Sequence, residues 1–116
     1  MTKDLLAEQT LQTQESTFIC NINAIPADDR PRYNKLVKSI IQAIDGKREL
    51  PDGYAFRLSS ERITAQQIVE WINLERSCCP FFGFEVHWEK ENGPISLFLT
   101  GREGVKAFIL SEFDLK

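Results

Sequence analysis

The sequence has no long hydrophobic run, no cluster of basic residues and few cysteine and histidine side chains. No apolar run approaches the roughly 18 residues of a membrane span, and the polar segment 1–17 lacks the hydrophobic core of a secretory signal, so we expect a cytoplasmic protein. Without a basic cluster, nucleic acids and anionic membrane surfaces lack the electrostatic attraction that they need. A glycine-rich phosphate loop is also missing, which argues against nucleotide binding of that kind.

The composition that remains is typical of one globular domain. The chain has 116 residues, 42% hydrophobic and 27% charged, with 14 basic and 17 acidic residues and a formal net charge of −3. This length is enough to bury a core, and eight Phe and two Trp predict that much of this core is aromatic. Residues 1–16 are mixed and polar, so we predict an N-terminal arm there and a single domain over residues 17–116.

Hydrophobic periodicity predicts the elements of this domain. Alternation favours strands, and apolar residues three or four apart favour helices. In chain order the patterns indicate a strand over 17–25, a helix over 26–46 ending at Gly46, a strand over 54–60, a helix through Cys78 or Cys79, a hairpin over 81–100 and a last helix to Phe113. The fold class is therefore α+β, in the order β-α-β-α-β-β-α. We expect a four-stranded, mostly antiparallel sheet with helices packed mainly on one face, and local pattern leaves the strand order open.

The helix that ends near Cys79 turns ionisable groups toward its apolar face. At about 100° per residue, Glu75 and Arg76 fall on the flanks of the apolar stripe that contains Ile72 and Cys79. One interpretation is structural, with both side chains reaching water at the helix end or Arg76 bonding the last carbonyls. The other is a polar pocket of Glu75, Arg76 and Cys79, in which Arg76 stabilises a thiolate and Glu75 orients Arg76 or handles a proton. The negative end of the helix dipole, which raises a cysteine pKa, argues against the second.

Three cysteines are too few for a disulfide framework, so we expect free or metal-bound thiols. Adjacent residues on a regular helix diverge by about 100°, but Pro80 forces Cys79 out of helical geometry and can aim both sulfurs at one point. Cys20 could supply a third thiolate, and the set Cys20, Cys78 and Cys79 would suit a soft metal or metalloid ion. The spacing is not C-x-x-C, so core packing and a redox or nucleophilic thiol stay open as alternatives.

The lone histidine is predicted on the other side of the sheet. Alternation over 82–89 places Phe84, Val86 and Trp88 on the helix-covered face and His87 on the opposite one. This placement argues against a Cys–His catalytic pair. The open face would be lined by Arg57, Glu85, His87 and Phe98, a mixture of charged and apolar groups that also suits a homodimer.

Three segments resemble an uncharacterised family of short bacterial proteins marked by an E-R-x-C-C-P-F core. They are RELPDGYAFRL, EWINLERSCCPFFGFEV and LTGREGVKAF, and the resemblance extends from about Phe18 to Phe113. The residues that match the motif are Glu75, Arg76, Cys78, Cys79, Pro80 and Phe81, with Cys20 and Asn21 in a first-strand element. The resemblance implies no activity.

The leading functional prediction is a non-enzymatic thiol site, beside Glu75 and Arg76, that binds a soft metal or metalloid through Cys78 and Cys79 with Cys20 as third ligand. One alternative is a structural or interaction module that dimerises through the open sheet face. Another is an enzyme that uses Cys79 as a thiolate held by Arg76. No nucleic-acid or membrane partner is expected.

Overall fold

The computed structural model describes residues 20–113. Its elements are the 3-10 helices η2 (Ile22–Ala24) and η3 (Ala27–Asp29), then α2 (Arg30–Ala43), β1 (Ile44–Leu50), β2 (Gly53–Leu58), α3 (Ala65–Cys78), β3 (Gly83–Trp88), β4 (Ile95–Thr100) and α4 (Val105–Phe113). The predicted N-terminal arm, residues 1–16, lies outside the described part. No helix within residues 20–113 is long and apolar enough to cross a membrane.

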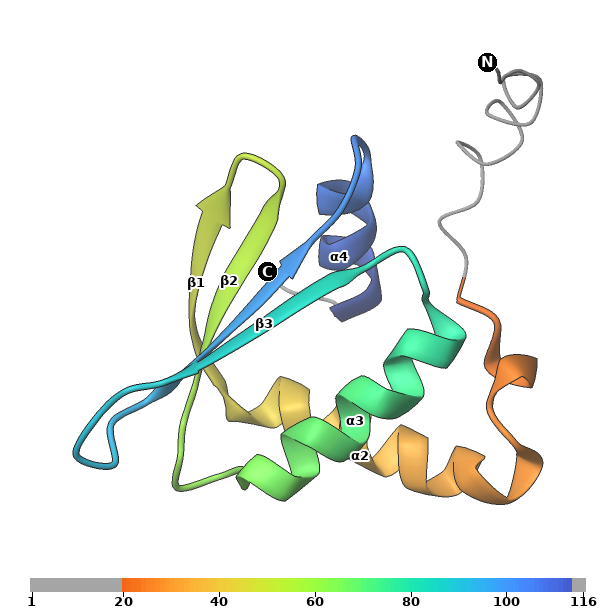
Figure 1. Cartoon of the computed structure of the whole chain (residues 1–116), viewed down its shortest axis with the longest axis horizontal. Helices are drawn as coiled ribbons and strands as arrows, with labels where there is room; N and C mark the ends of the chain where they lie inside the picture. The colour runs from red at the N-terminus through yellow and green to blue at the C-terminus, as the bar shows by residue number, and fades with distance from the viewer. Residues whose placement is uncertain (1–19, 114–116) are drawn as a thin grey trace, which may run out of the picture.

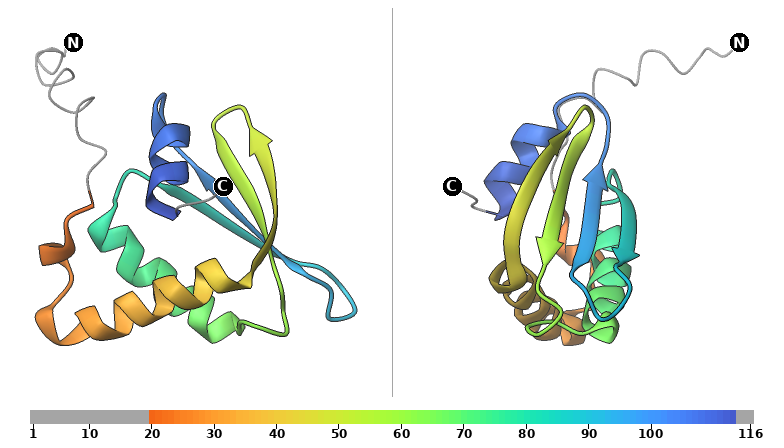
Figure 2. Two further views of the ribbon diagram at one scale, coloured as in Figure 1. Left: turned by 180° about the vertical axis from the view of Figure 1, so that it is seen from behind. Right: turned by 90° about the vertical axis from the view of Figure 1, so that its left-hand side faces the viewer.

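The four strands form one antiparallel sheet in the order β1-β2-β4-β3. Helices α2, α3 and α4 lie on the same side of this sheet (Figure 1), and Figure 2 shows the arrangement from behind and from the left-hand side of Figure 1. The predicted α+β class, with a four-stranded antiparallel sheet and helices on one face, is confirmed. The hairpin of β3 and β4 is also as predicted, and Glu91 and Asn92 take the positive φ angles, 61° and 58°, of its tight turn.

The first strand of the sheet differs from the predicted one. The described part of the segment predicted as a strand, residues 20–25, contains the 3-10 helix η2, which is capped by the Asn21 side chain, and its Ile22 is 39% exposed. The strand that the sheet uses is β1, which begins directly after α2, so Gly46 does not end that helix. Its sequence IDGKREL has charged residues at four of seven positions and shows no alternation. Pairing with β2 across the short turn at Pro51 and Asp52 makes this polar edge strand, which its own sequence pattern does not predict.

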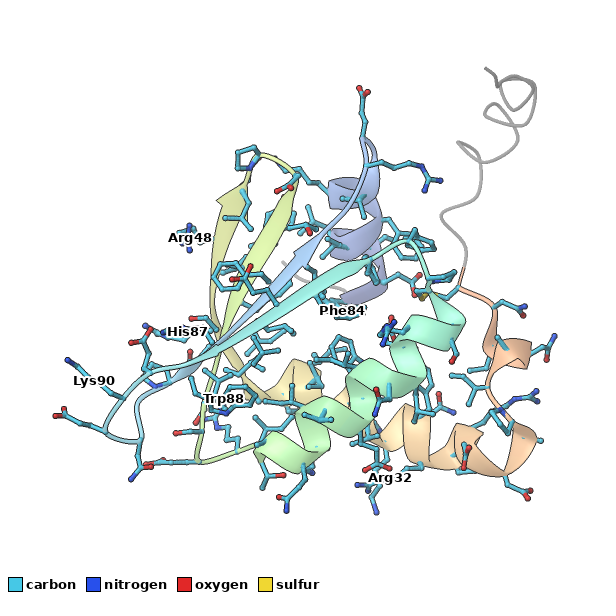
Figure 3. All side chains as sticks on the ribbon, in the orientation of Figure 1. Arg32, Arg48, Phe84, His87, Trp88 and Lys90 are labelled. Carbon is cyan, nitrogen blue, oxygen red and sulfur yellow. A yellow bond between two sulfur atoms is a disulfide. The ribbon has the colours of Figure 1, made fainter. Side chains whose placement is uncertain are left out.

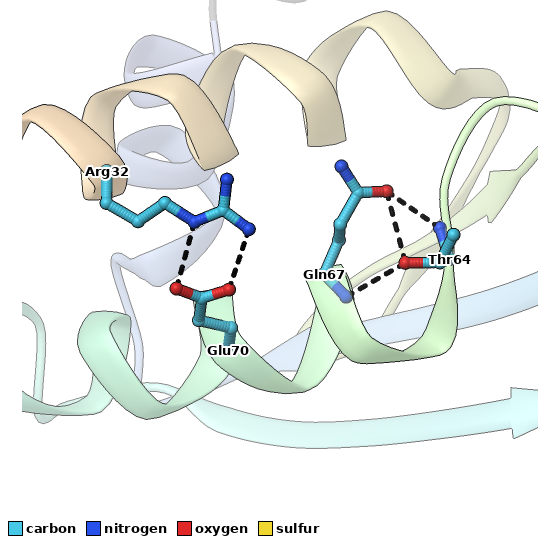
Figure 4. A network of polar contacts seen from close by, with 4 residues as sticks. All are labelled: Arg32, Thr64, Gln67 and Glu70. Atoms are coloured by element: carbon cyan, nitrogen blue, oxygen red, sulfur yellow. Dashed lines mark hydrogen bonds and ion pairs between the residues drawn. The ribbon is translucent and has the colours of Figure 1, made fainter.

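Helix α3 begins with a capping box. The Thr64 hydroxyl accepts from the Gln67 N–H at 3.1 Å, and the Thr64 N–H donates to the Gln67 side chain at 2.9 Å (Figure 4). One and a half turns later Glu70 forms a bidentate ion pair with Arg32 of α2, at 2.8 and 2.9 Å. The capping box sets the first residue of α3, and the ion pair joins α3 to α2. Together they position the last turn of α3, which carries Cys78.

The core lies between the sheet and the three helices. Most of its buried residues are aliphatic, and Tyr54, Phe56, Trp71, Phe82 and Phe113 are the buried aromatic ones, so the prediction of a core with much aromatic content holds only in part. Trp71 of α3 is fully buried and contacts Phe84 edge-to-face at 5.8 Å between ring centroids. Phe113 of α4 packs against both Trp71 and Phe56. The other side of the sheet is the open face: Figure 3 shows Arg48 and His87 there, with Phe84 and Trp88 on the helix side.

Candidate thiol site at the end of helix α3

The last turn of α3 carries two of the three cysteines. Cys78 is the final helical residue, and Cys79 leaves the helix with φ −128° and ψ 76°, directly before Pro80. The Cys79 N–H still donates to the Glu75 carbonyl at 2.6 Å, which anchors the turn. The predicted break at Pro80 is therefore present, and it lets two adjacent side chains point to one region.

Cys20 and Cys79 are joined by a disulfide, with 4.6 Å between their Cα atoms and a sequence separation of 59. This corrects the expectation that all thiols are free or metal-bound. Cys20 reaches Cys79 because the segment before α2 lies against the end of α3, where the Asn21 N–H donates to the Cys78 carbonyl at 2.8 Å. That contact is tertiary, and neither the number nor the spacing of cysteines predicts it.

Cys78 remains a free thiol and is buried. Its Sγ lies 3.8 Å from the Sγ of Cys79, and the three cysteine sulfurs all lie within 4.8 Å of one another. The prediction that Cys20, Cys78 and Cys79 come together is confirmed. No histidine or carboxylate of residues 20–113 joins this group as a fourth ligand.

Glu75 lies one turn before Cys78 and is only 3% exposed, so the prediction that it faces inward is confirmed. Burial raises the pKa of its carboxyl to about 7. The Tyr33 hydroxyl of α2 donates to Glu75 Oε1 at 2.7 Å and works in the opposite direction, while the charge of Glu112 adds to the increase. The carboxyl is thus poised to gain or lose a proton near neutral pH.

Burial also raises the pKa of the neighbouring groups. The pKa of the Cys78 thiol is raised by burial and then by the Glu75 carboxylate, with Tyr33 lowering it. The pKa of Tyr33 is raised by burial and by Glu75, so its hydroxyl keeps its proton and acts as a donor. The site therefore favours neutral side chains.

Arg76 does not belong to this group. It is exposed, so the prediction that it turns inward beside Cys79 is wrong, and an arginine on the flank of a stripe can extend its head to water. The partner that sequence analysis missed is Tyr33. It lies two residues after Pro31, at the start of α2, where no local pattern marks it, and only the packing of α2 on α3 brings it to Glu75.

The open-face residues lie as predicted. His87 is opposite Ser96 and Ser96 is opposite Arg57, while Phe98 lies between Ala55 and Glu85. His87 is exposed and ion-pairs with Glu89 at 3.2 Å if protonated. It faces away from the helix side, where the sulfurs lie, which agrees with the absence of a Cys–His pair.

Comparison of the chain with protein-family models, with curated proteins and with solved structures finds no match in any of the three. The resemblance to the E-R-x-C-C-P-F family stays a prediction, as do the motif's bacterial source and the cytoplasmic setting. Function is therefore inferred from the geometry of the site.

Proposed function

We propose that the reduced protein binds a soft thiophilic ion, trivalent arsenic first among them, through Cys20, Cys78 and Cys79. The observation that carries this proposal is the convergence of three sulfurs within 4.8 Å of one another. Two thiolates that bind one ion at about 2.3 Å lie about 3.8 to 4.0 Å apart at tetrahedral or trigonal angles, and roughly 3.5 Å apart at the narrower angles of pyramidal As(III). The 3.8 Å between the sulfurs of Cys78 and Cys79 is close to both distances.

The number of ligands favours a three-coordinate ion. A structural zinc site needs four ligands, and the described residues supply three. Soft thiolates select soft ions, so Hg(II) and trivalent arsenic fit the ligand set better than Mg²⁺ or Ca²⁺.

Burial favours arsenic over a divalent metal. Cys78 and Cys79 are 1% and 0% exposed, and an uncompensated charge is costly at such a site. Three thiols and arsenous acid, As(OH)₃, give a neutral As(SR)₃ complex and three waters, with no net release of protons. Zinc with three thiolates would leave a net negative charge in the core and release a proton from each thiol.

The disulfide would prevent ion binding until it is reduced. Oxidised protein offers one thiol, because the sulfurs of Cys20 and Cys79 are bonded to each other. A dithiol reductant of the cell would supply the two electrons and two protons that convert this bond to two thiols, and is itself oxidised to a disulfide. Ion binding would then depend on the redox state.

The test is titration of reduced and oxidised protein with arsenite, Hg(II) and Zn(II), followed by calorimetry and native mass spectrometry. We expect arsenite to bind the reduced form alone, with a mass gain of one arsenic less three hydrogens. Cys20→Ser and Cys78→Ser should each weaken binding by more than about tenfold, since each removes one of three bonds to the ion. Ser77→Ala, at an exposed position in the same turn, is the matched control.

Binding that survives unchanged in the double variant Cys78→Ser, Cys79→Ser would overturn the proposal. Equal binding by the oxidised and reduced forms would also overturn it, since the oxidised form has one thiol. A mass gain of one arsenic and one hydroxyl less two hydrogens would restrict the site to two ligands and remove one of the three cysteines from it.

A second candidate function is thiol–disulfide exchange, and the 3.8 Å between the sulfurs of Cys78 and Cys79 favours it. The Cys78 thiolate would attack Cys79 Sγ, the Cys78–Cys79 bond would form as the Cys20–Cys79 bond breaks, and Cys20 would leave and take up the proton that Cys78 lost. Alkylation of oxidised protein, mapped by peptide mass, tests this step. Labelling at Cys20 as well as Cys78 is expected, and labelling at Cys78 alone would exclude the exchange.

A further inference from the structure

One row of residues crosses the open face of the sheet in a self-complementary order. The row runs from Arg48 on β1, through Ala55 on β2 and Phe98 on β4, to Glu85 on β3, and each member is the register partner of the next. It therefore reads positive, small, large, negative. Reversed, it reads negative, large, small, positive, which complements the original at every position.

We propose that two copies of this chain pack open face against open face, about a two-fold axis that runs parallel to the strands between β2 and β4. This axis places β1 of one copy over β3 of its partner, and β2 over β4, so each row faces the same row in the opposite order. Arg48 of one copy faces Glu85 of its partner, and Phe98 faces the small Ala55. The same two contacts recur on the other side of the axis, as in any isologous interface.

The charges select this axis over the alternative one. A two-fold axis along the row, perpendicular to the strands, would place Arg48 on Arg48 and Glu85 on Glu85, and like charges across an interface are costly. The neighbouring row of register partners is Gly46, Arg57, Ser96 and His87. With the axis parallel to the strands this row also avoids like charges, because Arg57 faces Ser96 of the partner and His87 faces Gly46. Aligned sheets pack about 10 Å apart with a rotation of about 30°, which keeps the two rows within side-chain reach.

The surface relief beside the row supports the same pairing. A hollow of about 330 Å³ opens on this face, lined by Gly46, Arg48, Ala55, Arg57 and Ser96 among others. It lies where small residues of β1, β2 and β4 meet, next to the position over which the partner's Phe98 would lie. Arg48 now covers its own Phe98, with its guanidinium 6.0 Å from the ring centroid, and would turn to Glu85 of the partner on association.

The size of the face predicts a weak dimer. Four strands at about 4.8 Å and six residues at about 3.4 Å give a footprint of about 400 Å², roughly half of the 800 Å² per partner of a standard interface. We therefore expect a dissociation constant in the micromolar range. Arg48 and His87 point away from the helices, into the space that the partner would occupy (Figure 3).

The test is sedimentation of the full chain from low to high micromolar concentration, with charge-reversal variants. Arg48→Glu and Glu85→Arg should each weaken self-association by more than about tenfold, because each places like charges together twice. Mixing the two single variants should restore the dimer. On one side of the axis the two substituted side chains then form an ion pair of reversed polarity, and on the other side the native Arg48 and Glu85 meet. Lys90→Glu, in the β3–β4 turn, is the charge-matched control and should leave association unchanged.

Three results would overturn the proposal: a wild type that is strictly monomeric at high micromolar concentration, a mixture of the two variants that stays monomeric, or a dimer that is insensitive to both reversals. The last would assign association to another surface, such as the β3 edge with its 46% exposed Trp88. Thermal unfolding of each variant, compared with that of the wild type, separates a lost contact from a lost fold. The proposal is independent of ion binding, because neither variant changes a cysteine.

Discussion

At the scale of single residues, Glu75 makes stability depend on pH. Its pKa is about 7 in the folded protein against 4.5 for a free glutamate. Below pH 4.5 both states bind the proton, and between pH 4.5 and 7 the unfolded chain releases it while the folded protein keeps it. The stabilising contribution of this proton is therefore complete in acid and is lost as pH rises through 7, a change of about 3 kcal/mol.

Urea denaturation of wild type and Glu75→Gln across this range measures the effect. The glutamine variant lacks the titration, so the difference between the two free energies of unfolding should change by about 3 kcal/mol from pH 4.5 to 7 and then level off. Tyr33→Phe removes the hydrogen bond that lowers the pKa of Glu75, so the pH range over which stability falls should extend to higher pH in that variant. A pH-independent difference would show that Glu75 titrates as an ordinary carboxyl.

At the residue level, the sequence predicts the environment of a side chain correctly where its position alone decides that environment. Glu75 is buried because it falls beside the apolar stripe, and Cys79 leaves the helix because Pro80 follows it. The same reasoning gives the wrong environment for Arg76, whose long side chain extends from the other flank of the stripe to solvent. It could not find Tyr33, because a hydrogen bond across 42 residues depends on how two helices pack.

At the scale of elements, the disulfide ties the segment before α2 to the end of α3 across 59 residues. Closing a loop of this length in the unfolded chain is worth about 4 kcal/mol in the chain-entropy description. In a Cys78→Ser background, where this pair alone remains, reduction should lower the free energy of unfolding by about this amount. Denaturant curves with and without dithiothreitol measure it. The variant Cys20→Ser, Cys79→Ser should not respond to reductant, and a change below about 1 kcal/mol in the paired protein would contradict the prediction.

Elements with strong local signals were predicted, and the one with a weak signal was not. Helix α3 has a capping box and an apolar stripe, and β3 and β4 alternate around a tight turn, so each was visible in the sequence. Strand β1 is polar, lies at the sheet edge and exists through pairing with β2. The disulfide could not be predicted either, because it depends on the segment before α2 packing against the end of α3. Hydrophobic periodicity thus predicted the class of fold, and it missed a strand and a covalent bond that depend on contacts with other segments of the chain.

At the scale of the whole molecule, the proposed ion-binding site and the proposed dimer interface lie on opposite sides of the sheet. The sulfurs belong to the buried side beneath the helices, whereas Arg48 and Glu85 lie on the open face. The variants Arg48→Glu and Glu85→Arg should therefore bind arsenite as the wild type does, and Cys78→Ser should associate as the wild type does. These crossed measurements make a failure of one proposal distinguishable from a failure of the other.

Ion binding should also restore stability that reduction removes, because a ligand that binds the folded state preferentially stabilises it. At a free arsenite concentration about 100 times the dissociation constant, the free energy of unfolding of the reduced protein should rise by about 2.7 kcal/mol, and that of the oxidised protein should not change. The adjacent Cys78 and Cys79 can also bind arsenite in the unfolded chain, which subtracts from this gain. Cys20→Ser keeps that pair and loses the third thiol, so the increase should be smaller in this variant. If Cys20→Ser gains as much as the wild type, Cys20 is not a ligand, and the fold contributes nothing to the site beyond the adjacent pair.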